Sequence, residues 1–408
     1  MKKINLLIIG ASGAVANAFL VHFYKHRSLF GKLVLVDKNR KLLHHKHLNH
    51  RKLRYTFIHK EIILPKEEEV YLGLLKKYSI DIVLDLTDDN SLPFILATNK
   101  FGASMINTAM NQNSISLEKV MFNLFKIRGK IKNAPHILCS GMNPGVVNMW
   151  AALGINKFGI PRRLIEIEYD SGKVYGPWKP TITWSKKQFI EETAYDTSGA
   201  VLGQGEYLKC SKNSLVEFED LGKWFQPILN LKNYPPAFLT IHDECFSLAE
   251  KYDVPSRYLY AINEKTMRYL KRIYKEKGKI SLKAIEQVDN TNASLMGEDN
   301  IGLILDYKNK EIYYFNSISN SSIKDTNATL KQVIIGIYSA LFTLLYDNLK
   351  PGVYFPEDLY RTFYKYCLFK NMDVQEFIFK KKGKKLVLLK HTPKVDFKSS
   401  LNLNFLEI

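Results

Sequence analysis

Short apolar runs alternate with helical patterns over roughly the first 145 residues. The first run, residues 4–9, carries no charge, which is typical of a strand buried on both faces of a parallel sheet. Further strands of this kind are expected at 33–37, 81–86, 104–107 and 136–139. Strands that alternate with helices in this way predict a doubly wound parallel sheet.

The pattern changes after this region. A helix is expected over residues 146–157, and the alternation at 165–169 predicts a strand of a new sheet with one solvent-facing side. Strands are also expected at 303–305 and 312–315. The apolar run 333–346 predicts a buried helix, because it is too short to cross a bilayer.

The expected fold class is therefore α/β, with a Rossmann-like doubly wound parallel sheet and a second α+β catalytic domain. We place the NAD-binding Rossmann domain at residues 1–145 and the substrate domain at 146–328. Residues 329–379 are expected to form a helical segment that packs back on the first domain. Residues 380–408 are expected to be a basic tail.

Two glycines and one acid indicate what the first domain holds. Gly10 and Gly13 follow the first predicted strand, where glycines let the backbone approach a pyrophosphate at the positive end of the next helix. Asp37 ends the second predicted strand, where a carboxylate accepts hydrogen bonds from adenosine ribose hydroxyls. This order favours NAD over NADP, although Lys38 and Arg40 could face a 2′-phosphate. The alternative is a flavodoxin-like unit without a nucleotide.

The charge and the cysteine content do not alter the predicted fold or the predicted kind of site. The formal net charge is +19, but the positive residues are spread along the chain, with dense runs only at 380–385 and 51–54. A solvated lysine-rich surface is expected rather than a nucleic-acid site. Four scattered cysteines and the absence of a signal-peptide pattern favour a reducing, cytoplasmic location. The histidines at 44–50 lack partnering acids at helical spacing, so no metal site is expected.

Two short segments carry candidate chemistry. Asn143 lies in an Asn-Pro-Gly turn after a predicted parallel strand, where open α/β folds bind ligands. It could equally be a helix cap. Trp184 precedes Glu192 by eight residues, with Phe189 expected to face the core. A tryptophan face beside carboxylates suits an alkylammonium, and the alternative is that Trp184 only packs in the core.

These segments fall in the order of motifs in a known family. The chain resembles the homospermidine synthase-like branch of the saccharopine dehydrogenase superfamily. The resemblance lies in an Asn-Pro-Gly segment, a Glu-x-Asp, a Thr-Trp-Ser…Glu box, a His-x-Glu core, and an aromatic strand followed by Asn-Ala-Thr. These stand at residues 139–150, 168–170, 183–192, 238–244 and 312–333, and the resemblance is collinear over about residues 4–375.

The resemblance implies an NAD-dependent aminoalkyl transferase that makes a polyamine through an imine. By position, Trp184 would hold an ammonium or iminium by cation–π contact, and Glu168 and Glu192 would bind or deprotonate amino groups. Asn143 would orient the reacting amine, and His242 would line the pocket.

The chain also departs from the family pattern. Asn111 stands where the family carries a pocket glutamate, and Asp299 is an uncertain match to a further family carboxylate. Losing an acid weakens the case for a diamine, because each buried ammonium needs a compensating charge. Two alternatives stay open: an NAD(P)H oxidoreductase joining an amine to an aldehyde or keto acid, and an inactive nucleotide-binding regulatory protein.

The expected partners are small amines such as putrescine and a second copy of the chain in a homodimer. No membrane is expected, and nucleic acid is disfavoured. The residues expected to contact the cofactor are Gly10, Ser12, Gly13, Ala14, Asp37, Thr87 and Thr108.

Overall fold

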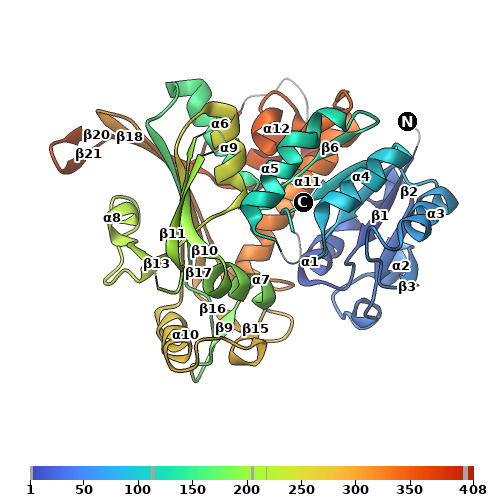
Figure 1. The fold of residues 1–408 in the computed structure, drawn as a ribbon, viewed down its shortest axis with the longest axis horizontal. Coiled ribbons are helices and arrows are strands. Elements are labelled where there is room, and N and C mark those ends of the chain that lie inside the picture. The colour runs from blue at the N-terminus through green and yellow to red at the C-terminus, as the bar shows by residue number, and fades with distance from the viewer. Residues whose placement is uncertain (1–2, 112–114, 204–205, 217, 398–402) are drawn as a thin grey trace. The chain divides into compact units, whose positions relative to one another are not determined.

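The computed structural model describes residues 3–111, 115–203, 206–216, 218–397 and 403–408. The chain forms two compact units, which we describe separately (Figure 1). The first consists of Met1–Met149, Gln332–Asn371 and Ser399–Ile408, and the second of Trp150–Lys331 and Met372–Lys398.

The first unit contains a seven-stranded sheet in which every neighbouring pair is parallel. Its strand order is β19-β6-β5-β4-β1-β2-β3, which confirms the predicted Rossmann-like class. The strands are β1 (Ile4–Ile9), β2 (Phe30–Asp37), β3 (Thr56–His59), β4 (Ile82–Asp85), β5 (Ser104–Asn107), β6 (Pro135–Ile137) and β19 (Gly352–Tyr354).

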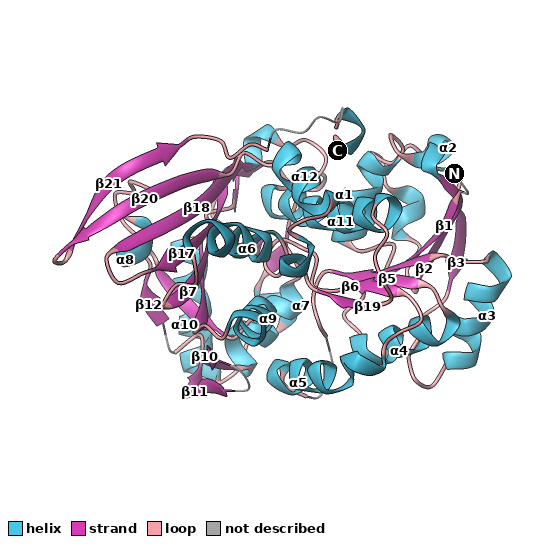
Figure 2. Ribbon diagram, turned by 90° about the horizontal axis from the view of Figure 1, so that it is seen from above, coloured by secondary structure: helices cyan, strands magenta, loops and turns pink. Residues whose placement is uncertain are grey.

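Helices cover both faces of this sheet, with α1, α11 and α12 on one side and α3, α4 and α5 on the other (Figure 2). Because both faces are covered, the strands are apolar throughout, as the uncharged and buried β1 shows. The helices of this unit are α1 (Ala14–Phe23), α2 (His50–Leu53), α3 (Glu68–Tyr78), α4 (Ser91–Phe101), α5 (Leu117–Ile127), α11 (Ala328–Tyr346) and α12 (Phe363–Asn371). Helix α6 (Val146–Phe158) begins in this unit and continues into the second.

Helix α11 is buried, as its composition predicted. Tyr338 is fully buried, and its hydroxyl donates to the Phe19 carbonyl of α1 over 2.9 Å. Within the described residues α11 is the one helix with the length and composition to cross a membrane, and 78% of its apolar window is buried inside the protein. Core helices of globular proteins show the same combination of apolar sequence and burial.

The described residues of the second unit form a ten-stranded mixed sheet. Its main order is β11-β10-β14-β7-β17-β18-β20-β21, and β13 pairs with both β12 and β14. These strands are β7 (Arg163–Asp170), β10 (Thr197–Gly203), β11 (Glu206–Asn213), β12 (Phe218–Asp220), β13 (Pro236–Thr240), β14 (Ser256–Ile262), β17 (Glu298–Asp306), β18 (Lys310–Ser319), β20 (Gln375–Lys382) and β21 (Lys385–Thr392). The last two form a hairpin, whose turn and second strand lie within residues 380–408, the stretch predicted to be a basic tail.

Smaller elements complete this unit. Two-stranded ladders join β8 (Lys173–Val174) to β16 (Leu295–Met296) and β9 (Thr181–Ile182) to β15 (Glu286–Gln287). The helices are α7 (Lys186–Ile190), which continues into a π-helical turn at Glu191–Tyr195, and α8 (Gly222–Phe225), α9 (Asp243–Tyr252) and α10 (Glu264–Lys277).

The central strand β7 has two different faces. Ile165 and Ile167 belong to an apolar core cluster on one face. Glu166, Glu168 and Asp170 alternate with them and therefore point to the other face. The prediction that this other face meets solvent is wrong, because each of the three acids is at most 3% exposed. Alternation of polar and apolar residues alone cannot tell a wet face from a buried polar one.

Candidate functional site

The strand-to-helix junction after β1 has the backbone shape that a dinucleotide requires. Gly10 has φ +78°, and a Cβ built there would lie 2.5 Å from the Leu86 carbonyl oxygen. Gly13 is the N-cap residue of α1, and no side chain caps the first turn of that helix. The first turn of α1 contains no acidic residue, so its N–H groups and positive dipole end suit an anionic group. Ala14, a predicted contact, is the first residue of α1.

Asp37, at the end of β2, forms hydrogen bonds with this junction. Its Oδ2 accepts the backbone N–H of Ser12 over 2.8 Å, and its Oδ1 accepts that of Asn39 over 2.6 Å. The Ser12 hydroxyl donates to the Asn39 carbonyl over 2.8 Å. A carboxylate has about four acceptor positions, so Asp37 can also receive ribose hydroxyls. The predicted acid and the predicted glycine loop are therefore brought together by direct hydrogen bonds.

Two further predicted contacts lie at the ends of neighbouring strands. Thr87 follows β4, and both its N–H and its hydroxyl donate to Asp85 Oδ1, over 3.1 and 2.7 Å. Burial raises the pKa of Asp85 to about 7, partly opposed by these hydrogen bonds from Thr87. Thr108 follows β5 and lies beside Gly141, where an added Cβ would come within 3.4 Å of the threonine Cβ. Asn143 belongs to the same loop after β6 and is half-buried.

We expect Asp37→Ala to weaken NAD binding by more than tenfold, or about 1.4 kcal/mol and above. The change removes the predicted ribose acceptor and also frees the Ser12 N–H. Isothermal calorimetry measures the affinity, and the thermal midpoint monitors folding. Asp37→Asn keeps one oxygen and should lose less than the alanine variant. An unchanged NAD affinity in both variants would remove Asp37 from the nucleotide site.

The second unit contains a buried group of acids and aromatic rings on the acidic face of its sheet. Glu168 of β7 accepts the Tyr258 hydroxyl at Oε2 over 2.6 Å. The Tyr258 ring stacks parallel to Tyr260 and lies 4.4 Å from the His242 ring, centroid to centroid. The Tyr260 hydroxyl accepts the indole N–H of Trp184 over 2.9 Å. A chain of contacts thus links three of the predicted residues: Glu168, His242 and Trp184.

The remaining members of this group lie in helical turns or next to them. His242 is the N-cap residue of α9, and its Nδ1 bonds to the Glu244 carboxylate in the first turn. Glu192 lies in the π-helical turn after α7 and is half-buried. We call Glu168, Trp184, Glu192, His242, Glu244, Tyr258 and Tyr260 the acid–aromatic cluster.

Thr183 is fixed from two sides, which holds the neighbouring Trp184 in place. Its hydroxyl donates to Asp170 Oδ2 over 2.5 Å, and its carbonyl accepts the Asn327 side-chain amide over 2.5 Å. The Trp184 ring then packs edge-on against Phe189 at 6.2 Å. Phe189 is fully buried, as predicted, whereas Trp184 is only half-buried.

The cluster holds more negative than positive charge. Burial raises the pKa of Glu192 to about 8; His242 opposes this shift, and the carboxylates of Asp196, Asp243 and Glu168 add to it. Burial alone would lower the pKa of His242, but the Glu244 carboxylate, with Glu192 and Asp243, raises it to about 10. His242 is therefore a cation at neutral pH and balances Glu244.

A buried group of carboxylates with too few cations needs either protons or a cationic ligand. One oxygen of Glu244 is buried without a hydrogen-bond partner among the described residues. Asp299 of β17 is also buried, and it pairs in register with Asp170. Burial, Glu168, Asp170 and Asp299 together raise the pKa of Tyr260 well above its usual range, so this phenol stays neutral. The site is suited to an alkylammonium and unsuited to an anion.

Glu166 lies two residues before Glu168 on β7, on the same face of the sheet, and is fully buried. Burial and the nearby Glu244 raise its pKa to about 8, while its hydrogen bond from Ser256 acts in the opposite direction. The folded state therefore holds this proton more tightly than the unfolded state does. The stability that Glu166 contributes as a neutral acid is lost as the pH rises from about 4.5 towards 8.

We accordingly expect Glu166→Gln to raise the free energy of unfolding by at least about 1 kcal/mol at pH 8.5 and to leave it nearly unchanged at pH 5. Urea unfolding at the two pH values measures this difference. The exposed Glu276 offers a matched control, because Glu276→Gln should show no such pH dependence. Equal effects of Glu166→Gln at both pH values would contradict an acid that is neutral when buried.

The sequence prediction missed Tyr258, Tyr260 and Glu244. The two tyrosines alternate with Leu259 along β14, in register with Glu166 and Glu168 of β7. The sequence did contain a signal for the tyrosines. They alternate with apolar residues in one segment, just as the acids of β7 alternate with apolar residues in another. Glu244 belongs to the His-x-Glu segment that carried the family resemblance.

A solved structure shares this architecture. The homospermidine synthase from Legionella pneumophila, solved in complex with NAD, aligns with a TM-score of 0.72 at 17% identity. The alignment covers 91% of this chain and 89% of that one. An amine dehydrogenase from Mycobacterium smegmatis aligns at a TM-score of 0.40 and 8% identity, covering 88% and 96%. No family model and no curated protein matches the sequence.

Of these two likenesses, the first extends through both units at a TM-score well above 0.5. It shows that the chain has the fold of that homospermidine synthase. Proteins that share a fold can have different functional sites, so the activity has to be argued from the residues.

Proposed function

We propose that the protein is an NAD-dependent enzyme of amine–imine chemistry, and specifically a homospermidine synthase-like aminoalkyl transferase. The observation that carries this proposal is the acid–aromatic cluster. Glu168, Glu192 and Glu244 surround aromatic rings, and His242 is the cation that balances one of them. A primary ammonium would supply the missing positive charge. The family motifs and the shared fold support the same conclusion.

In this proposal the first unit binds NAD. The glycine turn at Gly10–Gly13 and the first turn of α1 would hold the pyrophosphate, and Asp37 the adenosine ribose. Ser12, Ala14, Thr87 and Thr108 would complete the contacts. Lys38, which could have met a 2′-phosphate, forms an ion pair with Glu61 over 2.6 Å. This pairing favours NAD over NADP.

The reaction is a transfer without net oxidation. Bound NAD would supply the hydride chemistry, namely removal of a hydride from the carbon bearing the amino group and its return to the new carbon–nitrogen double bond. Between these steps a second amine adds to the carbon and ammonia leaves. Two molecules of putrescine thus give one of homospermidine and one of ammonia.

The residues of the cluster have distinct roles in this scheme. Trp184 would hold the cationic nitrogen against its indole face, and Glu168 would neutralise it. Glu192, whose pKa is about 8, would take a proton from the attacking ammonium when it is ionised, from about pH 8 upwards. His242 would stay protonated, because its pKa is about 10, and would hold Glu244 in place.

Incubating the protein with putrescine and a catalytic amount of NAD tests this proposal. A transferase yields homospermidine and ammonia in equal amounts, with no lasting NADH. Product is measured by chromatography and ammonia by a coupled assay. NAD binding without any product from a panel of amines would instead indicate a nucleotide-binding regulatory protein.

A second candidate function is a reductase that joins an amine to an aldehyde or keto acid. The observation that favours it is Asn111, which stands where the family has a pocket glutamate. The Asn111 side-chain amide donates to the Thr87 carbonyl over 3.3 Å, so it ties the ends of the loop after β4. Stoichiometric consumption of NADH with an amine and an aldehyde would identify the reductase.

A further inference from the structure

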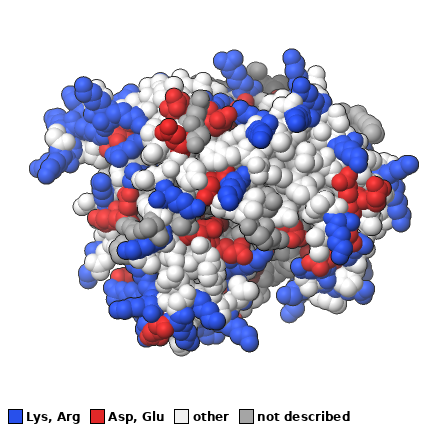
Figure 3. Space-filling model, viewed as in Figure 1, with Lys and Arg blue, Asp and Glu red and all other residues white. Residues whose placement is uncertain are grey.

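The hairpin of β20 and β21 has a strongly basic surface. Its two-residue turn lies at Gly383 and Lys384, with φ +60° at Gly383. Ladder pairing sets Lys380 opposite Val387, Lys382 opposite Lys385 and Ile378 opposite Lys390. Since directly opposed residues share a face, four lysines line one face and Lys384 stands at the tip. Figure 3 shows Lys and Arg side chains gathered where this hairpin lies in Figure 1.

Three aliphatic side chains on β21 are exposed beside these lysines. Val387 is 37% exposed, Leu388 51% and Leu389 61%. Because they are consecutive residues of the outermost strand, they do not share one face. Val387 lies on the lysine face, Leu388 is paired with Phe379 on the other face, and Leu389 lies where the register of the ladder shifts. We call Lys380, Lys382, Lys384, Lys385, Lys390, Val387, Leu388 and Leu389 the hairpin surface. Within the described part of the chain, none of these five lysines forms an ion pair, and all are exposed.

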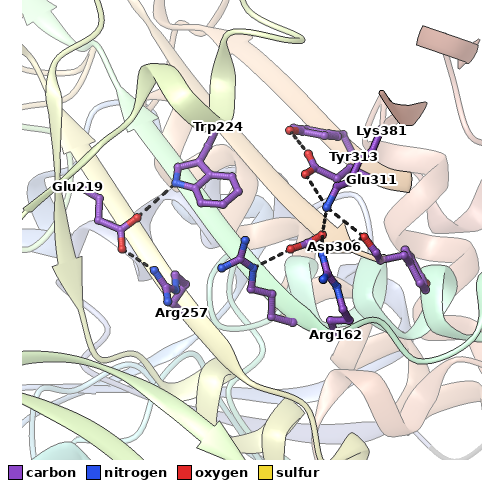
Figure 4. A network of polar contacts seen from close by, with 10 residues as sticks. Arg162, Glu219, Trp224, Arg257, Asp306, Glu311, Tyr313 and Lys381 are labelled. Carbon is purple, nitrogen blue, oxygen red and sulfur yellow. Dashed lines mark hydrogen bonds and ion pairs between the residues drawn. The ribbon is translucent and has the colours of Figure 1, made fainter. Parts of the chain in front are cut away.

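The remaining lysine of the run anchors the hairpin instead. Lys381 bonds to Asp306 and lies 3.1 Å from Glu311. Asp306 also pairs with Arg162 and Arg163, over 3.2 and 2.7 Å (Figure 4). Phe377 and Phe379 of β20 pack against the apolar core of the second unit. The face of the hairpin that carries Phe377, Phe379 and Lys381 is therefore fixed against the rest of the unit, and the free lysines belong to the other face and to the turn.

We propose that the hairpin surface docks this protein peripherally on an anionic lipid bilayer. Each lysine near such a surface gains electrostatic attraction, and aliphatic side chains gain by leaving water for the acyl boundary. One such signal gives marginal membrane binding, whereas the hairpin combines lysines on one face with aliphatic residues that are exposed along its outer strand. The sequence expectation of no membrane rested on spanning segments, and a folded surface of this kind does not span.

Other occupants fit the hairpin surface less well. A second copy of this chain would bring two sets of five unpaired lysines together, which is repulsive. Nucleic-acid surfaces combine basic residues with aromatic rings for stacking and with arginine forks. Here the exposed apolar residues are aliphatic and the cations are all lysine. Lysine with leucine and valine suits lipid headgroups and the layer beneath them.

Co-sedimentation with vesicles tests the proposal. The full protein should bind vesicles of phosphatidylcholine with phosphatidylserine and bind pure phosphatidylcholine at least tenfold less. Raising the salt from about 0.1 M to 1 M shortens the Debye length from about 10 to 3 Å and should release it. Changing Lys382, Lys384 and Lys385 together to Gln should lower the partition coefficient about a hundredfold, at about fivefold for each lysine. Leu389→Ser should lower it about tenfold.

A matched control changes three exposed lysines of α10 and the turn after it, Lys275, Lys277 and Lys279, to Gln. This variant has the same net charge as the hairpin variant and should bind vesicles like the unchanged protein. Equal loss in both variants would show that net charge alone is responsible and would overturn the proposal. So would equal binding to neutral vesicles, or tighter binding to duplex DNA than to anionic vesicles. The thermal midpoint and NAD affinity of each variant control for folding.

Discussion

Glu168→Gln is expected to lower kcat/KM for the amine by roughly 150-fold to 5,000-fold. The change keeps an oxygen that can accept the Tyr258 hydroxyl, so the local hydrogen bond survives. It removes the charge that would neutralise a buried ammonium, and breaking such a pair costs about 3–5 kcal/mol. Each 1.36 kcal/mol corresponds to about a tenfold change in rate. Steady-state assays of product formation measure the loss.

NAD affinity provides the control for this experiment, since the proposed nucleotide residues belong to the first unit and Glu168 to the second. It should stay within about twofold of the unchanged protein, which is below 0.5 kcal/mol. Glu192→Gln should also lose turnover, with a loss that grows above pH 8, where the native carboxyl is ionised. Full activity in both variants would exclude these acids from the site. Loss of NAD binding along with turnover would indicate misfolding.

Trp184→Ala is expected to abolish nearly all amine turnover, while Trp184→Phe keeps part of it. An indole face attracts an ammonium more strongly than a phenyl face, by up to about 2 kcal/mol when water is excluded. The activity should therefore fall in the order Trp, Phe, Ala. Trp184 is half-buried, so its removal should move the thermal midpoint less than removal of a core residue.

Trp224 is the matched control for this series. It is buried in the apolar core on the opposite face of the sheet, and its indole N–H donates to Glu219 over 3.3 Å. Trp224→Phe should lower stability with little effect on kcat per folded molecule. If the Phe and Ala variants of Trp184 were equally active, its role would be packing, and the amine proposal would rest on Glu168 and Glu192.

The first unit could be predicted from the sequence because its signals are local. The uncharged run of β1, the glycine turn and Asp37 each follow from the residues themselves, and β5 was predicted with its observed bounds. Strand β19 was not predicted, because its three residues are half-buried and are defined by pairing with β6. The β20–β21 hairpin was missed because its many lysines mask the alternation that marks a strand.

The acid–aromatic cluster shows a different limit. Trp184 and Glu192 could be selected because they stand close in sequence, at a spacing that suggests a shared face. Tyr258 and Glu168 are 90 residues apart and meet because β7 and β14 pair in register. Their polar positions alternate with apolar ones, which the sequence alone attributes to solvent. Strand pairing, and the burial that comes with it, decided where these side chains lie.

The division of the chain has a consequence for how the protein is made. The first unit begins at the first strand but also needs α12 and the short 3₁₀ turn at Asn404–Leu406. Asn371 donates to the Leu406 carbonyl over 2.8 Å, and the amide of Ile408 donates back to Asn371 over 2.9 Å. On the ribosome, domains usually fold in the order in which they emerge. Here strands β1 to β6 precede most of the second unit in the sequence, whereas β19 and α12 follow it, so the sheet is completed only after most of the second unit has been translated.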